Sequence, residues 1–121
     1  MVRKIMIVDD DKEFLEELKE SLQMNDYEVV AVDNPRLALE IAINTKPDLV
    51  LLDLKMPQES GFQVACEIMY YSGLKNTSII AMTGHFQQRY ESLRDGYGFK
   101  GFLKKPFDYF DLLCKIETSD N

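Results

Sequence analysis

The sequence predicts an α/β fold built on one doubly wound, five-stranded parallel sheet. Five short apolar runs alternate with segments of helical spacing, and no internal repeat or low-complexity linker interrupts them. This alternation favours right-handed βαβ crossovers with helices on both faces of the sheet. The common spatial order of five such strands is 2-1-3-4-5, which places the first and third strands side by side.

The predicted strands are short and nearly continuous in apolar residues, as expected for parallel strands covered on both faces. They are Lys4–Val8, Tyr27–Val32, Leu49–Leu52, Ser78–Met82 and Phe99–Leu103. A chain of 121 residues has the size of one ordinary domain. We therefore expect a single domain over residues 1–121, with a frayed polar tail from about residue 117.

Apolar residues three and four positions apart predict a helix after each strand. The predicted buried faces are Phe14, Leu15, Leu18 and Leu22; Leu37, Ala38, Ile41 and Ala42; Phe62, Ala65, Cys66 and Met69; Phe86, Tyr90 and Leu93; and Phe107, Phe110 and Leu113. Asn34 followed by Pro35 is typical of an N-cap and first helical position, and Asp108 suits the cap of the last helix.

Composition narrows the classes of function. The chain has 14 Lys and Arg against 21 Asp and Glu, a net charge of −7 that argues against direct binding of nucleic acid or an anionic membrane. No stretch approaches the roughly 20 apolar residues of a membrane span. Cys66 and Cys114 lack metal-ligand spacing, and we expect both to be buried in a protein of the reducing cytoplasm.

Acidic side chains follow the first and third predicted strands. Asp9 and Asp10 end the first and Asp53 ends the third, so the predicted strand order brings these carboxylates into one crevice. Like charges at such distances are costly unless a cation is present, and oxygen ligands suit Mg²⁺. A carboxylate beside that cation can attack a phosphoryl group and form an acyl phosphate.

The ends of the last two strands supply groups for the transferred phosphoryl. Lys105 offers a point charge, and the Thr83 hydroxyl offers a hydrogen bond. Both suit the charge on phosphoryl oxygens during transfer. Of the neighbouring lysines, we expect Lys104 to be solvated.

Four segments at these strand ends resemble the receiver domains of response regulators. They are Ile5–Asp10, Asp48–Pro57, Ala81–Gly84 and Phe102–Phe107, and Gly61 also stands where this family usually has glycine. The resemblance covers essentially the whole chain. It implies a flavodoxin-like (βα)5 fold with strand order 2-1-3-4-5.

The resemblance also implies a phosphorylation site. Asp53 would accept a phosphoryl group from a sensor histidine kinase or phosphotransfer protein. Asp10 would bind Mg²⁺ directly and Asp9 through water, with Asp53 and the backbone carbonyl of Lys55 completing the protein ligands. Thr83 and Lys105 would bind the phosphoryl oxygens. We expect a signalling switch whose only catalysis is its own phosphorylation and slow dephosphorylation.

Further roles are implied with alternatives open. Phe102 matches the family's switch aromatic, although a core position on the last strand explains it too. Lys55 and His85 stand where the lifetime of the phosphorylated state is tuned, or are exposed loop residues. The last strand with the fourth and fifth helices would contact a downstream effector or a second copy of the chain. Aromatic residues expected there are Phe86, Tyr90, Tyr97 and Tyr109.

Three other functions remain to be weighed. A pseudo-receiver, a binding module that is never phosphorylated, usually loses an acid, the threonine or the lysine, and this sequence keeps all of them. A flavodoxin-like cofactor binder needs a phosphate-cradling loop where this chain has Asp9–Asp11. An aspartyl-phosphate phosphatase needs a second acid at the position of Lys55.

Overall fold

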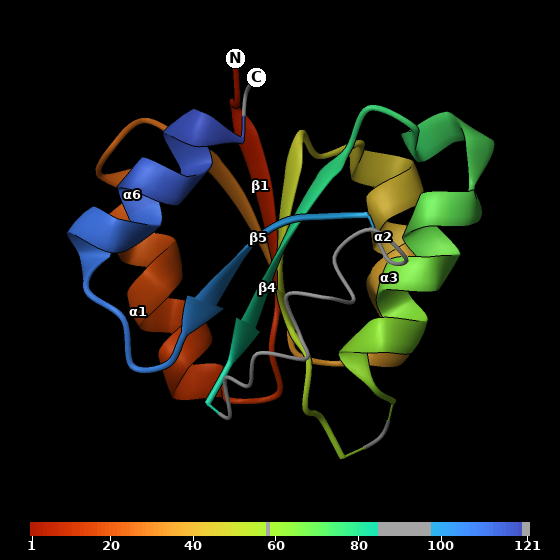
Figure 1. Ribbon diagram of the computed structural model, residues 1–121, viewed down its shortest axis with the longest axis horizontal. Coiled ribbons are helices and arrows are strands. Elements are labelled where there is room, and N and C mark those ends of the chain that lie inside the picture. Colours follow the sequence, from red (N-terminus) through yellow and green to blue (C-terminus); the bar gives the residue numbers. More distant parts are fainter. Residues whose placement is uncertain (58, 85–97, 120–121) are drawn as a thin grey trace.

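The protein is described by a computed structural model that covers residues 1–57, 59–84 and 98–119. Its centre is a five-stranded parallel sheet with the order β2-β1-β3-β4-β5 (Figure 1). The strands are β1 Lys4–Val8, β2 Glu28–Val32, β3 Leu49–Asp53, β4 Ser78–Thr83 and β5 Phe99–Lys104. The predicted fold class and strand order are confirmed, and β3, β4 and β5 each run one residue further than expected.

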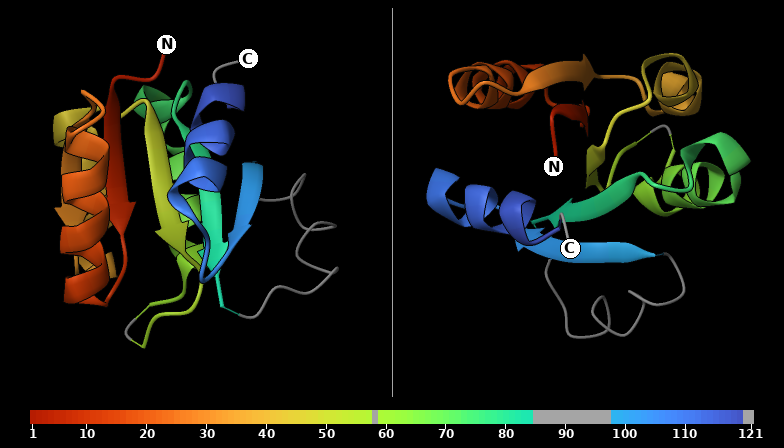
Figure 2. Two further views of the ribbon diagram at one scale, coloured as in Figure 1. Left: turned by 90° about the vertical axis from the view of Figure 1, so that its left-hand side faces the viewer. Right: turned by 90° about the horizontal axis from the view of Figure 1, so that it is seen from above.

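Helices cover both faces of this sheet (Figure 2). Helices α1 (Lys12–Gln23) and α6 (Tyr109–Thr118) lie on one face, and α2 (Ala38–Thr45) and α3 (Gly61–Tyr70) lie on the other. Alternate residues of each strand serve the two layers, so that in β1 Met6 packs toward α2 and α3 and Ile5 packs toward α1 and α6. Burial on both faces explains why the two central strands β1 and β3 are nearly continuous in apolar residues.

The predicted caps of the second and last helices form, but the second helix begins differently than expected. Asn34 accepts a hydrogen bond from the amide of Arg36, and Asp108 accepts one from the amide of Asp111. Asn34 opens a short 3₁₀ turn, Pro35–Leu37, which precedes α2. A 3₁₀ turn has three residues per turn, so Leu37 points outward and is 45% exposed, which corrects its predicted place in the buried face.

Two other buried faces differ from the prediction. In α6 the buried residues are Leu112 and Ile116, and Phe110 is 73% exposed. The prediction counted helical spacing from Phe107, which precedes the cap and lies outside the helix. In α3 the fully buried apolar side chains are Val64, Ala65 and Ile68, while Phe62, Cys66 and Met69 are only half-buried.

The C-terminal part of the chain brings further corrections. Cys114 is exposed on α6 and Cys66 is half-buried, so the expected burial of both cysteines is wrong. The predicted tail begins too early, because Glu117 and Thr118 are still helical. The predicted fourth helix, with Phe86, Tyr90 and Leu93, lies outside the described residues. Within the part of the chain that is described, no helix is long and apolar enough to cross a membrane.

Gly61 allows α3 to begin directly against the end of β3. A Cβ atom on Gly61 would lie 2.2 Å from the carbonyl oxygen of Asp53 and 2.7 Å from the Cα of Leu54. The Gly61 amide also donates to the Leu54 carbonyl at 3.1 Å. Since both obstructing atoms belong to the backbone, a side chain here would have to displace the segment that carries Asp53.

We predict that Gly61→Ala lowers the free energy of unfolding by at least about 2 kcal/mol, because backbone atoms cannot yield to the added methyl group. This reverses the usual gain from Gly→Ala in a helix. Urea unfolding measures the change. The matched control is Gly84→Ala, where an added Cβ meets nothing within 4 Å and the change should stay within about 0.5 kcal/mol. Equal effects at the two glycines would contradict the packing account.

Candidate functional site

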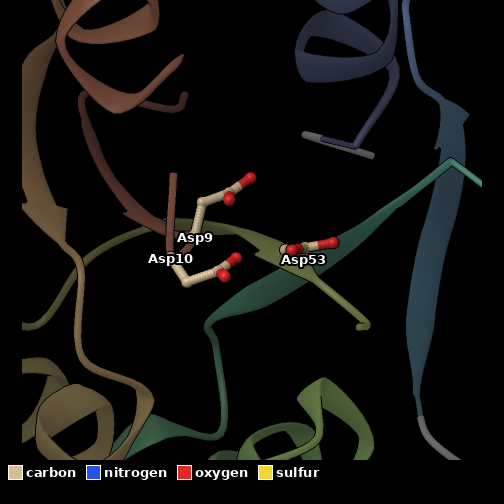
Figure 3. A group of neighbouring side chains, drawn as sticks. All are labelled: Asp9, Asp10 and Asp53. Atoms are coloured by element: carbon tan, nitrogen blue, oxygen red, sulfur yellow. The ribbon is translucent and has the colours of Figure 1, made fainter. Parts of the chain in front are cut away.

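Three carboxylates meet where β1 and β3 end. Asp9, Asp10 and Asp53 each offer an oxygen, and these oxygens lie within 4.8 Å of one another (Figure 3). The register that pairs Val8 with Leu52 sets the following residues, Asp9 and Asp53, next to each other. Asp9 is 1% and Asp53 is 6% exposed, whereas Asp10 faces solvent. The sheet order thus brings together the carboxylates that the sequence predicts to be neighbours.

Lys105, which directly follows β5, brings one positive charge to this carboxylate cluster. Its ammonium group pairs with Asp9 Oδ2 and lies 3.8 Å from Asp53 Oδ1. The Lys105 amide donates to the Thr83 carbonyl at 2.7 Å, which extends the β4–β5 pairing beyond the strand ends. The peptide bond from Lys105 to Pro106 is cis. Lys104 is exposed, as expected from the sequence.

One lysine does not neutralise three carboxylates, and the pKa values of Asp9 and Asp53 are both raised. Burial, with a further contribution from the charge of Asp9, raises the pKa of Asp53 to about 6. Burial also raises the pKa of Asp9, against the opposing effects of Lys105 and of the Asp11 amide. The neutral form of each acid is therefore favoured relative to an acid in water.

The chemistry of these donors fits a divalent metal ion. With all three acids ionised and Lys105 protonated, the cluster carries −3 + 1 = −2, which one divalent cation balances. Clustered carboxylate oxygens with an open, solvent-facing side suit Mg²⁺, which keeps several waters. Asp9, Asp10 and Asp53 are the side chains that could hold it.

Three of the other predicted site residues, Thr83, Phe102 and Lys55, belong to the described part of the chain. Thr83 closes β4 and is 2% exposed. Phe102 is buried on β5, with its ring edge-on to Phe99 at 5.4 Å between centroids. Lys55 is exposed, and its amide donates to Asp53 Oδ1 at 3.4 Å. His85 lies outside the described residues.

Of the predicted aromatic surface, the structure describes Tyr109. The Tyr109 hydroxyl donates to the Ser21 carbonyl at 2.6 Å and accepts from the Asn25 amide group at 2.8 Å. Tyr109 therefore joins α6 to α1 through its hydroxyl, and its side chain is half-buried. Phe86, Tyr90 and Tyr97 lie outside the described residues, and the exposed aromatic side chain on α6 is Phe110.

Asp11 has the simpler role that its position suggests. It is the N-cap of α1, and its carboxylate accepts from the Phe14 amide at 3.1 Å. The sequence placed Phe14 in the core, but the structure sets its half-buried ring 4.4 Å from the Lys105 ammonium. The sequence shows an aromatic residue three positions after the cap. Its contact with Lys105 depends on the tertiary fold and is not visible in the sequence.

Comparison with protein families decides the classification. Residues 5–117 match the response regulator receiver domain. The chain belongs to this family. Two curated relatives of this receiver domain are the nisin biosynthesis regulatory protein NisR of Lactococcus lactis subsp. lactis and the transcriptional regulatory protein PdtaR of Mycobacterium tuberculosis. NisR is 35% identical over 98% of the chain, and PdtaR is 36% identical over 97%. The chain covers 51% of NisR and 56% of PdtaR, about half of each relative's length.

Solved structures resemble the receiver domain over nearly its whole length. The chemotaxis protein CheY4 of Vibrio cholerae is 27% identical, with a TM-score of 0.92 over 98% of this chain and 99% of CheY4. The response regulator TrrA of Thermotoga maritima, solved in complex with Mg²⁺ and BeF, is 32% identical. Its TM-score is 0.83 over 97% of this chain and 98% of TrrA.

The raised pKa of Asp53 has a consequence for stability. In the folded receiver domain the Asp53 pKa is about 6, and the ordinary value is 3.8. The folded state therefore binds this proton more tightly than the unfolded state, and the stabilisation is lost as the pH rises from about 4 through 6. Above that window the buried charge lowers the free energy of unfolding.

We predict that Asp53→Asn raises the free energy of unfolding at pH 7 without metal by on the order of 2–3 kcal/mol, since it removes this buried charge. The gain should disappear below about pH 4. Urea unfolding at both pH values measures it. Asp33→Asn is the control, because Asp33 forms an exposed pair with Lys12 at 3.7 Å and should contribute little. No gain at Asp53, or the same gain at both pH values, would contradict the assignment.

Proposed function

We propose that this receiver domain is a phosphorylation switch in which Asp53 accepts a phosphoryl group from a sensor histidine kinase or phosphotransfer protein, in a Mg²⁺-dependent reaction. The observation that carries the proposal is the cluster in which a buried Asp53 lies beside two further acids and the Lys105 ammonium. The TrrA complex with Mg²⁺ and BeF supports it by similarity.

The proposed chemistry is an in-line displacement. An ionised oxygen of Asp53 attacks the phosphorus, the bond from phosphorus to the donor nitrogen breaks, and its electron pair stays on the imidazole. Asp9, Asp10, Asp53 and the Lys55 carbonyl would hold Mg²⁺, which when bound supplies positive charge against the phosphoryl oxygens. Lys105 adds a second charge, and the Thr83 hydroxyl donates a hydrogen bond.

We further propose that phosphorylation changes the surface of β5 and α6, together with the helix that the sequence predicts between β4 and β5. Engagement of Thr83 with the phosphoryl group would favour the buried position of Phe102, and the altered surface would bind an effector or a second receiver domain. Lys55 and His85 would tune access of the hydrolytic water. On this account the protein is a signalling switch, with slow hydrolysis of its own acyl phosphate, rather than an enzyme acting on other molecules.

We predict that incubation with Mg²⁺ and acetyl phosphate adds one phosphoryl group, because Asp53 would act as the nucleophile beside the proposed Mg²⁺. Intact mass spectrometry measures the gain. Asp53→Asn and removal of the metal by a chelator should each abolish it. An unmodified wild type under all metal and donor conditions would favour the pseudo-receiver, a binding module of the same fold.

We predict that Lys105→Met slows phosphoryl uptake by on the order of 10²-fold, the cost of removing one charge that stabilises the transition state. The neighbouring Lys104→Met is the matched control, and it should change the rate by less than about twofold because Lys104 is exposed. Rates come from the mass increase over time with acetyl phosphate. Equal rates for the two variants would remove Lys105 from the proposed site.

A further inference from the structure

We propose that Phe14 is a positioning residue that holds Lys105 against Asp9 and so raises the Mg²⁺ concentration needed to load the acid cluster. The inference rests on the proposed Mg²⁺ site. It assigns to the first turn of α1 a part in setting how readily the switch becomes competent for phosphoryl transfer.

The contact is a cation–π interaction braced from a second side. The Lys105 ammonium lies 4.4 Å from the centroid of the Phe14 ring. Phe107 meets the same ring edge-on, with centroids 6.1 Å apart and an interplanar angle of 87°. Both rings are half-buried and pack on the apolar layer beneath α1 and α6. The electron-rich face of the Phe14 ring is therefore held beside the Lys105 ammonium.

The local sequence explains how the ring reaches this place. Asp11 caps α1 by accepting from the Phe14 amide at 3.1 Å, and its own amide donates to Asp9 Oδ1 at 3.0 Å. The segment from Asp9 to Phe14 thus carries both Asp9 and the aromatic ring. The Lys105 ammonium contacts each of them.

This arrangement engages both oxygens of Asp9. Oδ1 accepts from the Asp11 amide and Oδ2 pairs with Lys105. A metal ion that uses Asp9 Oδ2, directly or through water, would compete with the ammonium for that oxygen. Because Phe14 stabilises the ammonium where it lies, it adds to the cost of displacing the ammonium. Loss of the ring should therefore strengthen Mg²⁺ binding.

The test is a Mg²⁺ titration of the whole domain, followed by the NMR shift of the Lys55 amide, which hydrogen-bonds to Asp53. We expect Phe14→Leu to bind Mg²⁺ about two- to fivefold more tightly than wild type, the range of a partly exposed cation–π contact. Phe14→Tyr keeps the ring and should match wild type. Phe110→Leu removes an exposed ring from α6 and should also match it.

A second readout separates positioning from packing. Protons of the Lys105 ε-methylene beside a ring face are shifted upfield, and the shift should vanish in Phe14→Leu and return in Phe14→Tyr. Merely loosened packing would weaken Mg²⁺ binding instead of strengthening it.

Unchanged or weaker Mg²⁺ binding in Phe14→Leu overturns the inference, and so does a wild type that binds no Mg²⁺. Tighter binding in Phe14→Leu together with a wild type that accepts no phosphoryl group would uphold this inference and overturn the proposed function. The two failures are therefore distinguishable.

Discussion

The structure depends on a crowding of like charges that the described residues neutralise only in part. Asp9 and Asp53 are buried at the ends of adjacent strands, Asp10 lies beside them, and Lys105 supplies one positive charge. Burial makes this arrangement costly, as the raised pKa values of Asp9 and Asp53 record. A divalent cation or protonation would lower this cost, so the donor set of the cluster is compatible with a bound metal ion.

The fold keeps this cluster in place against its own repulsion. The sheet is apolar on both faces, so its strands cannot slide without exposing core residues. Gly61 lets α3 start against the Asp53 carbonyl, and the Lys105 amide is tied to the Thr83 carbonyl. The Phe14 ring contacts the Lys105 ammonium from the α1 side. The packing of the core thus offsets the electrostatic cost of the carboxylate cluster. Functional sites in proteins often carry such a cost.

The sequence predicted the sheet and the composition of the crevice because both follow from local patterns. Apolar runs and the polar residues that follow them can be recognised in the sequence. The parallel strand order then determines which strand ends are neighbours. The buried face of α6 was mispredicted because Phe107 lies before the cap, and for the same helix the exposed Cys114 was expected to be buried. Leu37 was expected to be buried but lies in a 3₁₀ turn and is exposed. The contact between Phe14 and Lys105 joins distant segments, and the pKa of Asp53 depends on burial, so neither could be read before the fold was known.

The most direct test is the titration of the Asp53 side-chain carboxyl by carbon-13 NMR, in the absence and presence of Mg²⁺. Without metal the pKa should lie at about 6, because burial and Asp9 favour the protonated form. With Mg²⁺ it should fall well below that value, since the cation favours the carboxylate. An ordinary pKa near 3.8 without metal, or a pKa that does not respond to Mg²⁺, would contradict the claim that unneutralised charge defines this site.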